Sequence, residues 1–370
     1  MKKEFILISC LTLLLMSCKT TNFHKHKEIS SFYIGTMPSK EAPTSEGIYQ
    51  SSIDSNGKFG KVTLIAKTDS PTFLTKTENQ KYLIATNSTS QGALKSYKID
   101  SKNITEISTT TTTDAGPCYV NTQNGFVLSA NYSSGSINLF KIDDSGNLSS
   151  LLDRQKHQIS TPSKHKRQKK PFAHSCYFEP SSDNIIAIDL GANKLLFSHI
   201  KNNHLVPNVF SELEMPANSG PRHLAFHPKK AILYVVNELS ATVTVIQKNT
   251  KNNTYQIVET IPTLPANFKG QNTAAHILIS QDAQFLYMTN RGHESITVFH
   301  IKEDGTLEFV EQVGVHGEHP RNFTLSPDNR FLIVANRDTN NLVSFQRNTK
   351  TGKLTYIEQI KTPRPVCLLF

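Results

Sequence analysis

The sequence has no tryptophan, few cysteines and a low proportion of charged residues. Of its 370 residues, five are Cys and 19% are charged, while 37% are hydrophobic. The absence of Trp excludes the Trp-Asp signature of WD40 blades, and this composition argues against disorder, collagen and a long coiled coil. Beyond the first sixteen residues no segment is apolar enough to span a bilayer, and helical periodicity is not evident. A globular, core-forming protein of class all-β is what remains.

The positive charge of the chain is concentrated in one place. Lys and Arg exceed Asp and Glu by 40 to 30, a net charge of +10, and seven of the basic residues lie between positions 154 and 170, where no carboxylate occurs. This stretch is called the basic segment below. Because the excess is local, a nucleic-acid-binding face is not needed to explain it, and we expect no nucleic-acid partner.

The N-terminus carries a sorting signal. Lys2 and Lys3 precede an apolar run over 5–16, which is too short to cross a bilayer but suits a signal-peptide core. The run ends in Leu-Met-Ser-Cys at 15–18, which resembles the lipobox of bacterial lipoproteins. It predicts a signal peptide over 1–17, a lipid anchor on Cys18, a polar tether over 18–31 and export to the bacterial cell envelope, on its periplasmic or surface face. An ordinary secretory signal with an incidental cysteine is the alternative.

The remaining cysteines do not form a framework. Removal of the signal and acylation of Cys18 leave Cys118, Cys176 and Cys367, and three cysteines cannot all pair. Each has apolar or aromatic neighbours, so we predict small buried core residues. No Cys/His spacing supports a metal site.

A pattern of four short strands recurs along the chain. Each unit has an apolar strand, a turn, a second strand ending in a polar or small residue, a third strand, and a turn into a fourth that is often Gly-x-Leu. The residues that end the second strand are Gly35, Asn87, Asn131, Asp189, Asn237, Asn290 and Asn336, spaced 44 to 58 apart. Seven such units predict a seven-bladed β-propeller over residues 32–370.

The two ends of the repeat region complement each other. Residues 32–35 read as a second strand with no first strand before it, and residues 365–370 read as a first strand with nothing after it. We therefore predict that the C-terminal strand pairs into the first blade, which closes the ring and leaves no long unpaired edge.

Polar residues of several units are predicted to meet at one mouth of the ring. In an antiparallel hairpin the start of the first strand lies beside the end of the second. Arg222 and Glu238 are equidistant from residue 230 and are therefore predicted to be cross-strand neighbours. The same alignment places His174, Arg321 and Arg291 of neighbouring units at this mouth.

These residues belong to motifs that resemble a known family. Gly-Pro-Arg-His-Leu-Ala-Phe-His-Pro at 220–228, followed by Tyr-Val-Val-Asn-Glu-Leu at 234–239, is similar to the signature of the seven-bladed lactonases, which include bacterial 6-phosphogluconolactonase and the fungal carboxymuconate lactonizing enzyme. Further matches at 130–136, 189–191 and 290–296 spread the resemblance over the chain. It implies His174, Arg222, Glu238 and Arg291 as catalytic residues, with no redox cofactor and no metal.

Two positions depart from the family pattern. Phe172-Ala173-His174 stands where the family usually has His-Ala-His, and His276 stands where an acidic residue is usual. We therefore expect a different substrate preference, and we expect Arg321, His276 and His223 to bind the substrate.

Ring opening of a lactone has chemical requirements that these residues meet. It needs a base for water, an acid for the departing alkoxide, and cationic or hydrogen-bonding groups for the oxyanion. Glu238 and His174 could be base and acid, and Arg222 and Arg291 could hold a carboxylate or phosphate. The competing interpretation is a structural Arg222–Glu238 salt bridge. The basic segment, expected at the same mouth, could steer anions, remain a solvated loop or face anionic lipid.

The sequence thus predicts a monomeric lactone hydrolase for a small anionic lactone, derived from a sugar acid or a related compound. Export conflicts with a cytosolic phosphogluconolactone as substrate. Two alternatives remain open: a muconate-type cycloisomerase, and a non-catalytic surface propeller that binds protein or glycan.

Overall fold

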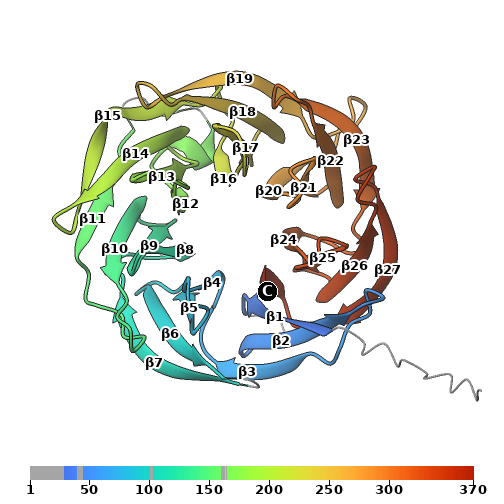
Figure 1. Cartoon of the computed structure of the whole chain (residues 1–370), viewed down its shortest axis with the longest axis horizontal. Coiled ribbons are helices and arrows are strands. Elements are labelled where there is room, and N and C mark those ends of the chain that lie inside the picture. The colour runs from blue at the N-terminus through green and yellow to red at the C-terminus, as the bar shows by residue number, and fades with distance from the viewer. Residues whose placement is uncertain (1–28, 40–44, 101–102, 160–162, 164) are drawn as a thin grey trace, which may run out of the picture.

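Seven four-stranded antiparallel sheets surround a central axis (Figure 1). This computed structural model describes residues 29–39, 45–100, 103–159, 163 and 165–370. It confirms the predicted seven-bladed β-propeller. The predicted signal peptide and Cys18 lie outside the described residues, among which no helix is long and apolar enough to cross a membrane.

Each blade contributes one strand to each of four concentric positions. The innermost strands are β28 (Pro365–Leu369), β4 (Leu74–Lys76), β8 (Pro117–Gln123), β12 (Ala173–Phe178), β16 (Pro221–Phe226), β20 (Thr273–Ile279) and β24 (Pro320–Leu325). The second strands are β1 (Ile29–Thr36), β5 (Tyr82–Asn87), β9 (Phe126–Asn131), β13 (Asn184–Asp189), β17 (Ile232–Asn237), β21 (Phe285–Arg291) and β25 (Phe331–Asn336). The third strands are β2 (Gly47–Asp54), β6 (Ala93–Ile99), β10 (Ser136–Lys141), β14 (Lys194–Lys201), β18 (Thr242–Asn249), β22 (Ser295–Ile301) and β26 (Asn341–Arg347). The outer strands are β3 (Thr63–Lys67), β7 (Ile104–Thr111), β11 (Asp153–Lys156), β15 (His204–Glu214), β19 (Thr254–Pro262), β23 (Leu307–Gly314) and β27 (Leu354–Lys361).

The ring closes between the two ends of the repeat region. Strand β28 pairs with β1, with Tyr33 opposite Leu369 and Gly35 opposite Cys367, and so completes the sheet β28-β1-β2-β3. The predicted closure is confirmed. Strand β1 begins at Ile29, so the propeller starts three residues before the predicted boundary at residue 32.

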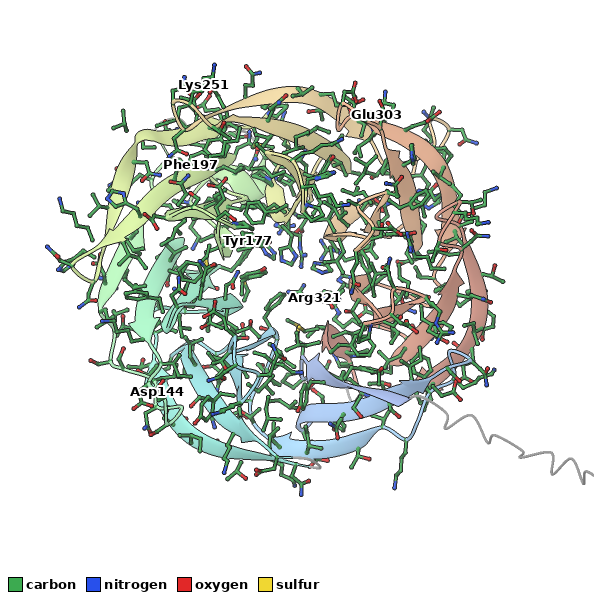
Figure 2. The ribbon with its side chains drawn as sticks, in the orientation of Figure 1. Asp144, Tyr177, Phe197, Lys251, Glu303 and Arg321 are labelled. Carbon is green, nitrogen blue, oxygen red and sulfur yellow. The ribbon has the colours of Figure 1, made fainter. Side chains whose placement is uncertain are left out.

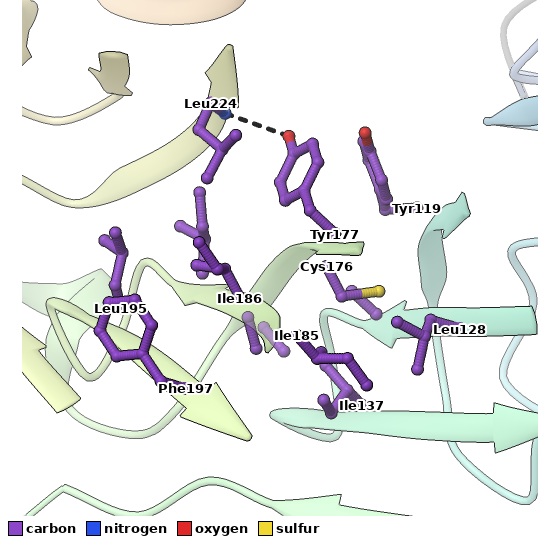
Figure 3. Packing of buried hydrophobic residues seen from close by; sticks show 14 of the residues in the cluster. Tyr119, Leu128, Ile137, Cys176, Tyr177, Ile185, Ile186, Leu195, Phe197 and Leu224 are labelled. Carbon is purple, nitrogen blue, oxygen red and sulfur yellow. Dashed lines mark hydrogen bonds between the residues drawn. The ribbon is translucent and has the colours of Figure 1, made fainter. Parts of the chain in front are cut away.

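Burial decreases from the second strands to the outer ones. Every residue of β17 and of β25 is buried, because both faces of each blade pack against neighbouring blades, whereas β19 exposes about half of its residues. The core therefore lies between the blades. Figure 3 shows one such layer, in which Leu128 and Ile137 of the third blade pack near Ile185 of the fourth.

Neighbouring blades are also joined by a hydrogen bond that recurs. The hydroxyls of Tyr234 and Tyr287 donate to the carbonyls of Gly305 and Gly352, at 2.8 Å each, in the third-to-fourth-strand turn of the next blade. Both glycines have positive φ, and a Cβ on Gly305 would overlap Ile232. The glycines of these Gly-x-Leu motifs therefore lie in turns that contact the second strand of the preceding blade.

Candidate active site

The side chains predicted at the mouth stand on β-bulges. Strand pairing shifts between Pro221 and His223, so Arg222 is an extra residue with no partner in β17; the same shift occurs around His174 in β12 and Arg321 in β24. Arg222 and Glu238, predicted to be cross-strand neighbours, do contact each other, but they are not a ladder pair: Pro221 and His223 pair with Asn237 and Val236, and Glu238 follows the end of β17. A bulge redirects its side chain, and these three side chains reach the mouth for that reason.

Glu238 is the centre of the polar cluster. Its carboxylate is 3% exposed; Oε2 lies 3.1 Å from Arg222 Nε, and Oε1 lies 3.0 Å from an Arg291 Nη and in contact with Arg167. Burial would raise the pKa of this carboxyl, but Arg291, Arg222 and Arg167 together hold it well below its usual range. Glu238 is therefore ionised at neutral pH and fully engaged by cations.

Two of these arginines are fixed by main-chain carbonyls. Arg222 donates to the carbonyl of Ala275, and Arg291 donates to those of Thr273 and Ala274 at 3.2 and 2.7 Å. The donor groups of both guanidinium groups are thus largely satisfied within the protein, by main-chain carbonyls and by Glu238. Arg222 and Arg291 position Glu238 more than they offer free donors to a ligand.

Arg321 has the opposite character. It lies beside the central axis (Figure 2) and lines the pocket, yet among the described residues nothing forms a hydrogen bond or ion pair with it. Burial and the neighbouring Arg291 lower its pKa to about 10, which leaves the group charged at neutral pH. Arg321 is the cation available to an anionic ligand.

His174 faces Glu238 across a gap. Its Nε2 lies 3.8 Å from Oε2 of Glu238, too far for a direct hydrogen bond. Burial and Arg222 hold the pKa of His174 well below its ordinary value, so the ring is neutral at pH 7. A neutral imidazole is a far weaker acid than an imidazolium, which weighs against the expected role of His174 as general acid.

His223 and His276 lie behind the pocket wall, in a layer of aromatic rings. Nδ1 of His223 is 2.8 Å from Nδ1 of His276, and the His223 ring packs edge-on against His174 and Tyr119. Neither histidine lines the pocket, so the structure does not bring these two expected substrate-binding residues to the site. Tyr177, labelled in Figure 2, extends this layer by its contact with Tyr119.

The basic segment supplies a residue that sequence reasoning missed. The short 3-10 helix η1 (Lys166–Gln168) carries Arg167, whose Nε and one Nη donate to the Tyr132 hydroxyl at 3.1 and 2.7 Å while the other Nη contacts Glu238. Within the described part of the basic segment, Arg167 lies at the predicted mouth, whereas Arg154 and Lys156 belong to the outer strand β11. Tyr132 follows Asn131 as Glu238 follows Asn237, so the repeat alignment contained the signal for Tyr132. Nothing in the sequence singled out Arg167 among seven basic residues.

The cysteines only partly match their prediction. Cys176 and Cys367 are buried, as expected, but Cys118 is half-buried and lines the pocket. Burial raises the pKa of the Cys118 thiol to about 12, so it is not a nucleophile at neutral pH.

The pocket itself has a volume of about 360 Å³. Its wall includes one carboxylate, Glu238, and the guanidinium groups of Arg167, Arg291, Arg321 and Arg337. Since cations outnumber the carboxylate, the pocket attracts anions.

Comparison with known proteins decides the family. The model of the seven-bladed β-propeller lactonases matches residues 31–370. The chain belongs to this lactonase family. Among characterised relatives, the 6-phosphogluconolactonase of Bacillus subtilis is 34% identical over 346 residues, which cover 91% of this chain and 98% of the relative.

Two solved structures superpose closely on the chain. A periplasmic gluconolactonase of Pseudomonas aeruginosa is 28% identical, with a TM-score of 0.87 over 92% of this chain and 98% of its own. A Lactobacillus plantarum protein is 29% identical, with a TM-score of 0.86 over 93% and 99%. These similarities support a lactonase enzyme, as the sequence motifs predicted.

Proposed function

We propose that this lactonase is an exported, lipid-anchored enzyme that hydrolyses the lactone of a sugar acid or a related anionic lactone. The observation that carries the proposal is Arg321, a charged side chain in the pocket with no partner among the described residues. An anionic substituent or a developing oxyanion would satisfy it. The relatives named 6-phosphogluconolactonase and gluconolactonase act on lactones of this class.

The reaction follows from the groups around Glu238. A water in the pocket beside Glu238 and His174 attacks the lactone carbonyl, and its proton passes to the Glu238 carboxylate. Arg321 stabilises the negative charge on the carbonyl oxygen. When the ring C–O bond breaks, Glu238 returns the proton to the departing oxygen, and the product is an open hydroxy acid. His174 stays neutral and positions the water.

Export supports a lactone outside the cytoplasm as substrate. The proposal rests on the apolar run over 5–16 and the lipobox-like sequence at 15–18. A single acyl chain binds membranes only weakly, so stable attachment needs the several chains of a lipoprotein. In detergent fractionation, wild-type protein should be found with membranes and the Cys18→Ser variant in the soluble fraction. Equal release of both contradicts the anchor.

Activity is tested with a panel of lactones. Purified protein lacking residues 1–18 is mixed with glucono-, phosphoglucono- and muconolactones, and acid release is followed by pH-stat after subtraction of spontaneous hydrolysis. Arg321→Ala should lower kcat/KM at least tenfold on the best anionic substrate, because it removes the cation proposed to stabilise the oxyanion. Arg330→Ala, which removes an exposed arginine outside the pocket, is the matched control. If the protein hydrolyses no lactone but converts a muconate, the cycloisomerase is favoured. If it converts neither, a propeller that binds protein or glycan is favoured.

A further inference from the structure

Arg167 reaches Glu238 from outside the blades. The guanidinium groups of Arg222 and Arg291 come from β16 and β21, but Arg167 belongs to η1 in the connection between the third and fourth blades. It contacts Oε1 of Glu238, the same oxygen that Arg291 binds. The carboxylate therefore has one partner that is not part of the propeller framework.

The three arginines differ in how firmly they are held. Side chains of Arg222 and Arg291 are 2% and 6% exposed and donate to main-chain carbonyls. Arg167 is 29% exposed, and besides Glu238 its side chain donates only to the Tyr132 hydroxyl among the described residues. Burial raises the pKa of Tyr132, so that partner is a neutral phenol. Of the three arginine contacts of Glu238, the one with Arg167 costs the least free energy to replace.

Replacement of Arg167 as a partner of Glu238 also changes the basicity of the Glu238 carboxylate. With guanidinium groups on both oxygens, Glu238 is a weak base, because each cation stabilises its ionised form. Arg222 and Arg291 cannot leave without breaking their bonds to the main chain. Arg167 can turn to another anion in the pocket while keeping its bond to Tyr132.

We propose that Arg167 is a substrate-contacting specificity residue that exchanges Glu238 for an anionic oxygen of the lactone. This exchange leaves Oε1 of Glu238 with Arg291 alone and makes the carboxylate a better base for water. The proposal rests on the proposed lactonase function and adds that an anionic group on the substrate promotes the reaction itself. Neutral lactones, which offer Arg167 no anion, are then turned over more slowly.

The test compares Arg167→Ala with Lys169→Ala. Both variants remove one positive charge from the same segment, but Lys169 is exposed and outside the pocket. For Arg167→Ala we expect the preference for phosphogluconolactone over gluconolactone, measured as a ratio of kcat values, to fall about tenfold or more. Lys169→Ala should leave that ratio unchanged. If this preference falls equally in both variants, the basic segment acts only by long-range electrostatic attraction of the anion, and the proposal is overturned.

The pH profile gives a second readout. Charged and titratable groups facing Glu238 are Arg222 of β16, Arg291 of β21, Arg321 of β24, His174 of β12 and Arg167. Loss of Arg167 removes one stabilising cation, so the acidic limb of kcat/KM should move to higher pH, and it should not move in Lys169→Ala. An unmoved limb in Arg167→Ala contradicts the contact.

A binding measurement separates this proposal from the proposed function. Calorimetric titration with gluconate, or with inorganic phosphate, needs no turnover. If wild type hydrolyses no lactone, the proposed function fails, but weaker anion binding in Arg167→Ala than in Lys169→Ala still supports Arg167 as the anion contact. Wild type that binds neither anion, or Arg167→Ala that binds both as wild type does, overturns the inference.

Discussion

At the scale of single residues, Glu238 has two tasks that a substitution affects together. It balances three arginines in a buried cluster, and it is the proposed proton acceptor. Removing the charge therefore leaves guanidinium groups without a counter-charge, and stability falls along with activity.

Glu238→Gln should lower kcat about 10²-fold or more, the usual scale for a general base, and should also lower the melting temperature. Glu308→Gln, which alters a carboxylate that is 69% exposed, is the control for both measurements. Stopped-flow or pH-stat kinetics with circular dichroism melts separate the two effects. Full activity of Glu238→Gln would make His174 the first candidate for the base.

Residue chemistry was predictable only where the repeat fixes it. His174, Arg222, Glu238 and Arg291 lie together because equivalent positions of neighbouring blades face one mouth. The placement of His223 and His276 was not predictable, since a one-residue bulge decides which of two adjacent side chains turns to the pocket. Arg167 lies on an insertion that follows no repeat.

At the scale of elements, the tyrosine-to-glycine hydrogen bonds couple the fifth blade to the sixth and the sixth to the seventh. Tyr234 of β17 is fully buried, and its only acceptor among the described residues is the Gly305 carbonyl. Loss of the hydroxyl leaves a buried carbonyl without this donor, which costs about 1–3 kcal/mol.

Tyr234→Phe should therefore lower the melting temperature by a few degrees. Tyr356→Phe is the matched control, because its ring is 41% exposed and it should leave the melt unchanged. Identical melting temperatures for Tyr234→Phe and wild type would show that the turn needs no such bond.

The blades were predictable as elements because each is a local unit with its own turn signals. Second strands such as 331–336 are continuous apolar runs that end in Asn, and the structure buries all of β25. The start of β1 was less predictable, since Ser30 and Ser31 separate Ile29 from the apolar run that begins at Phe32.

At the scale of the whole molecule, stability depends on β28. Val366, Cys367 and Leu368 are at most 6% exposed, and burial of three such side chains contributes on the order of 5 kcal/mol. Truncation before Pro365 should lower the melting temperature by about 10 °C or more. A synthetic peptide of residues 363–370 should restore part of the loss, and a scrambled peptide should not. An unchanged midpoint in the truncated protein would mean that the ring is held by its other contacts.

The buried histidines make the molecule sensitive to acid. Burial lowers the pKa of His276 to about 3, and it also lowers those of His174 and His223. Below the ordinary pKa of about 6.5 the unfolded chain takes up protons that the folded protein does not, so stability falls as the pH drops from there toward the folded-state pKa of His276, about 3. His276→Asn should flatten this fall in pH-dependent melts. His204→Asn, which changes a side chain that is 66% exposed, should not.

Closure by β28 also sets an order of assembly. Tyr33 and Leu369 are partners, although more than three hundred residues of chain separate them. Six blades are built from strands close in sequence and can form as the chain is made, but the first sheet stays one strand short until residue 369 has been synthesised. During that interval the inner edge of β1 is an open template for other strands. A chaperone that covers this strand edge would be needed only during synthesis, because β28 covers the edge once the ring has closed.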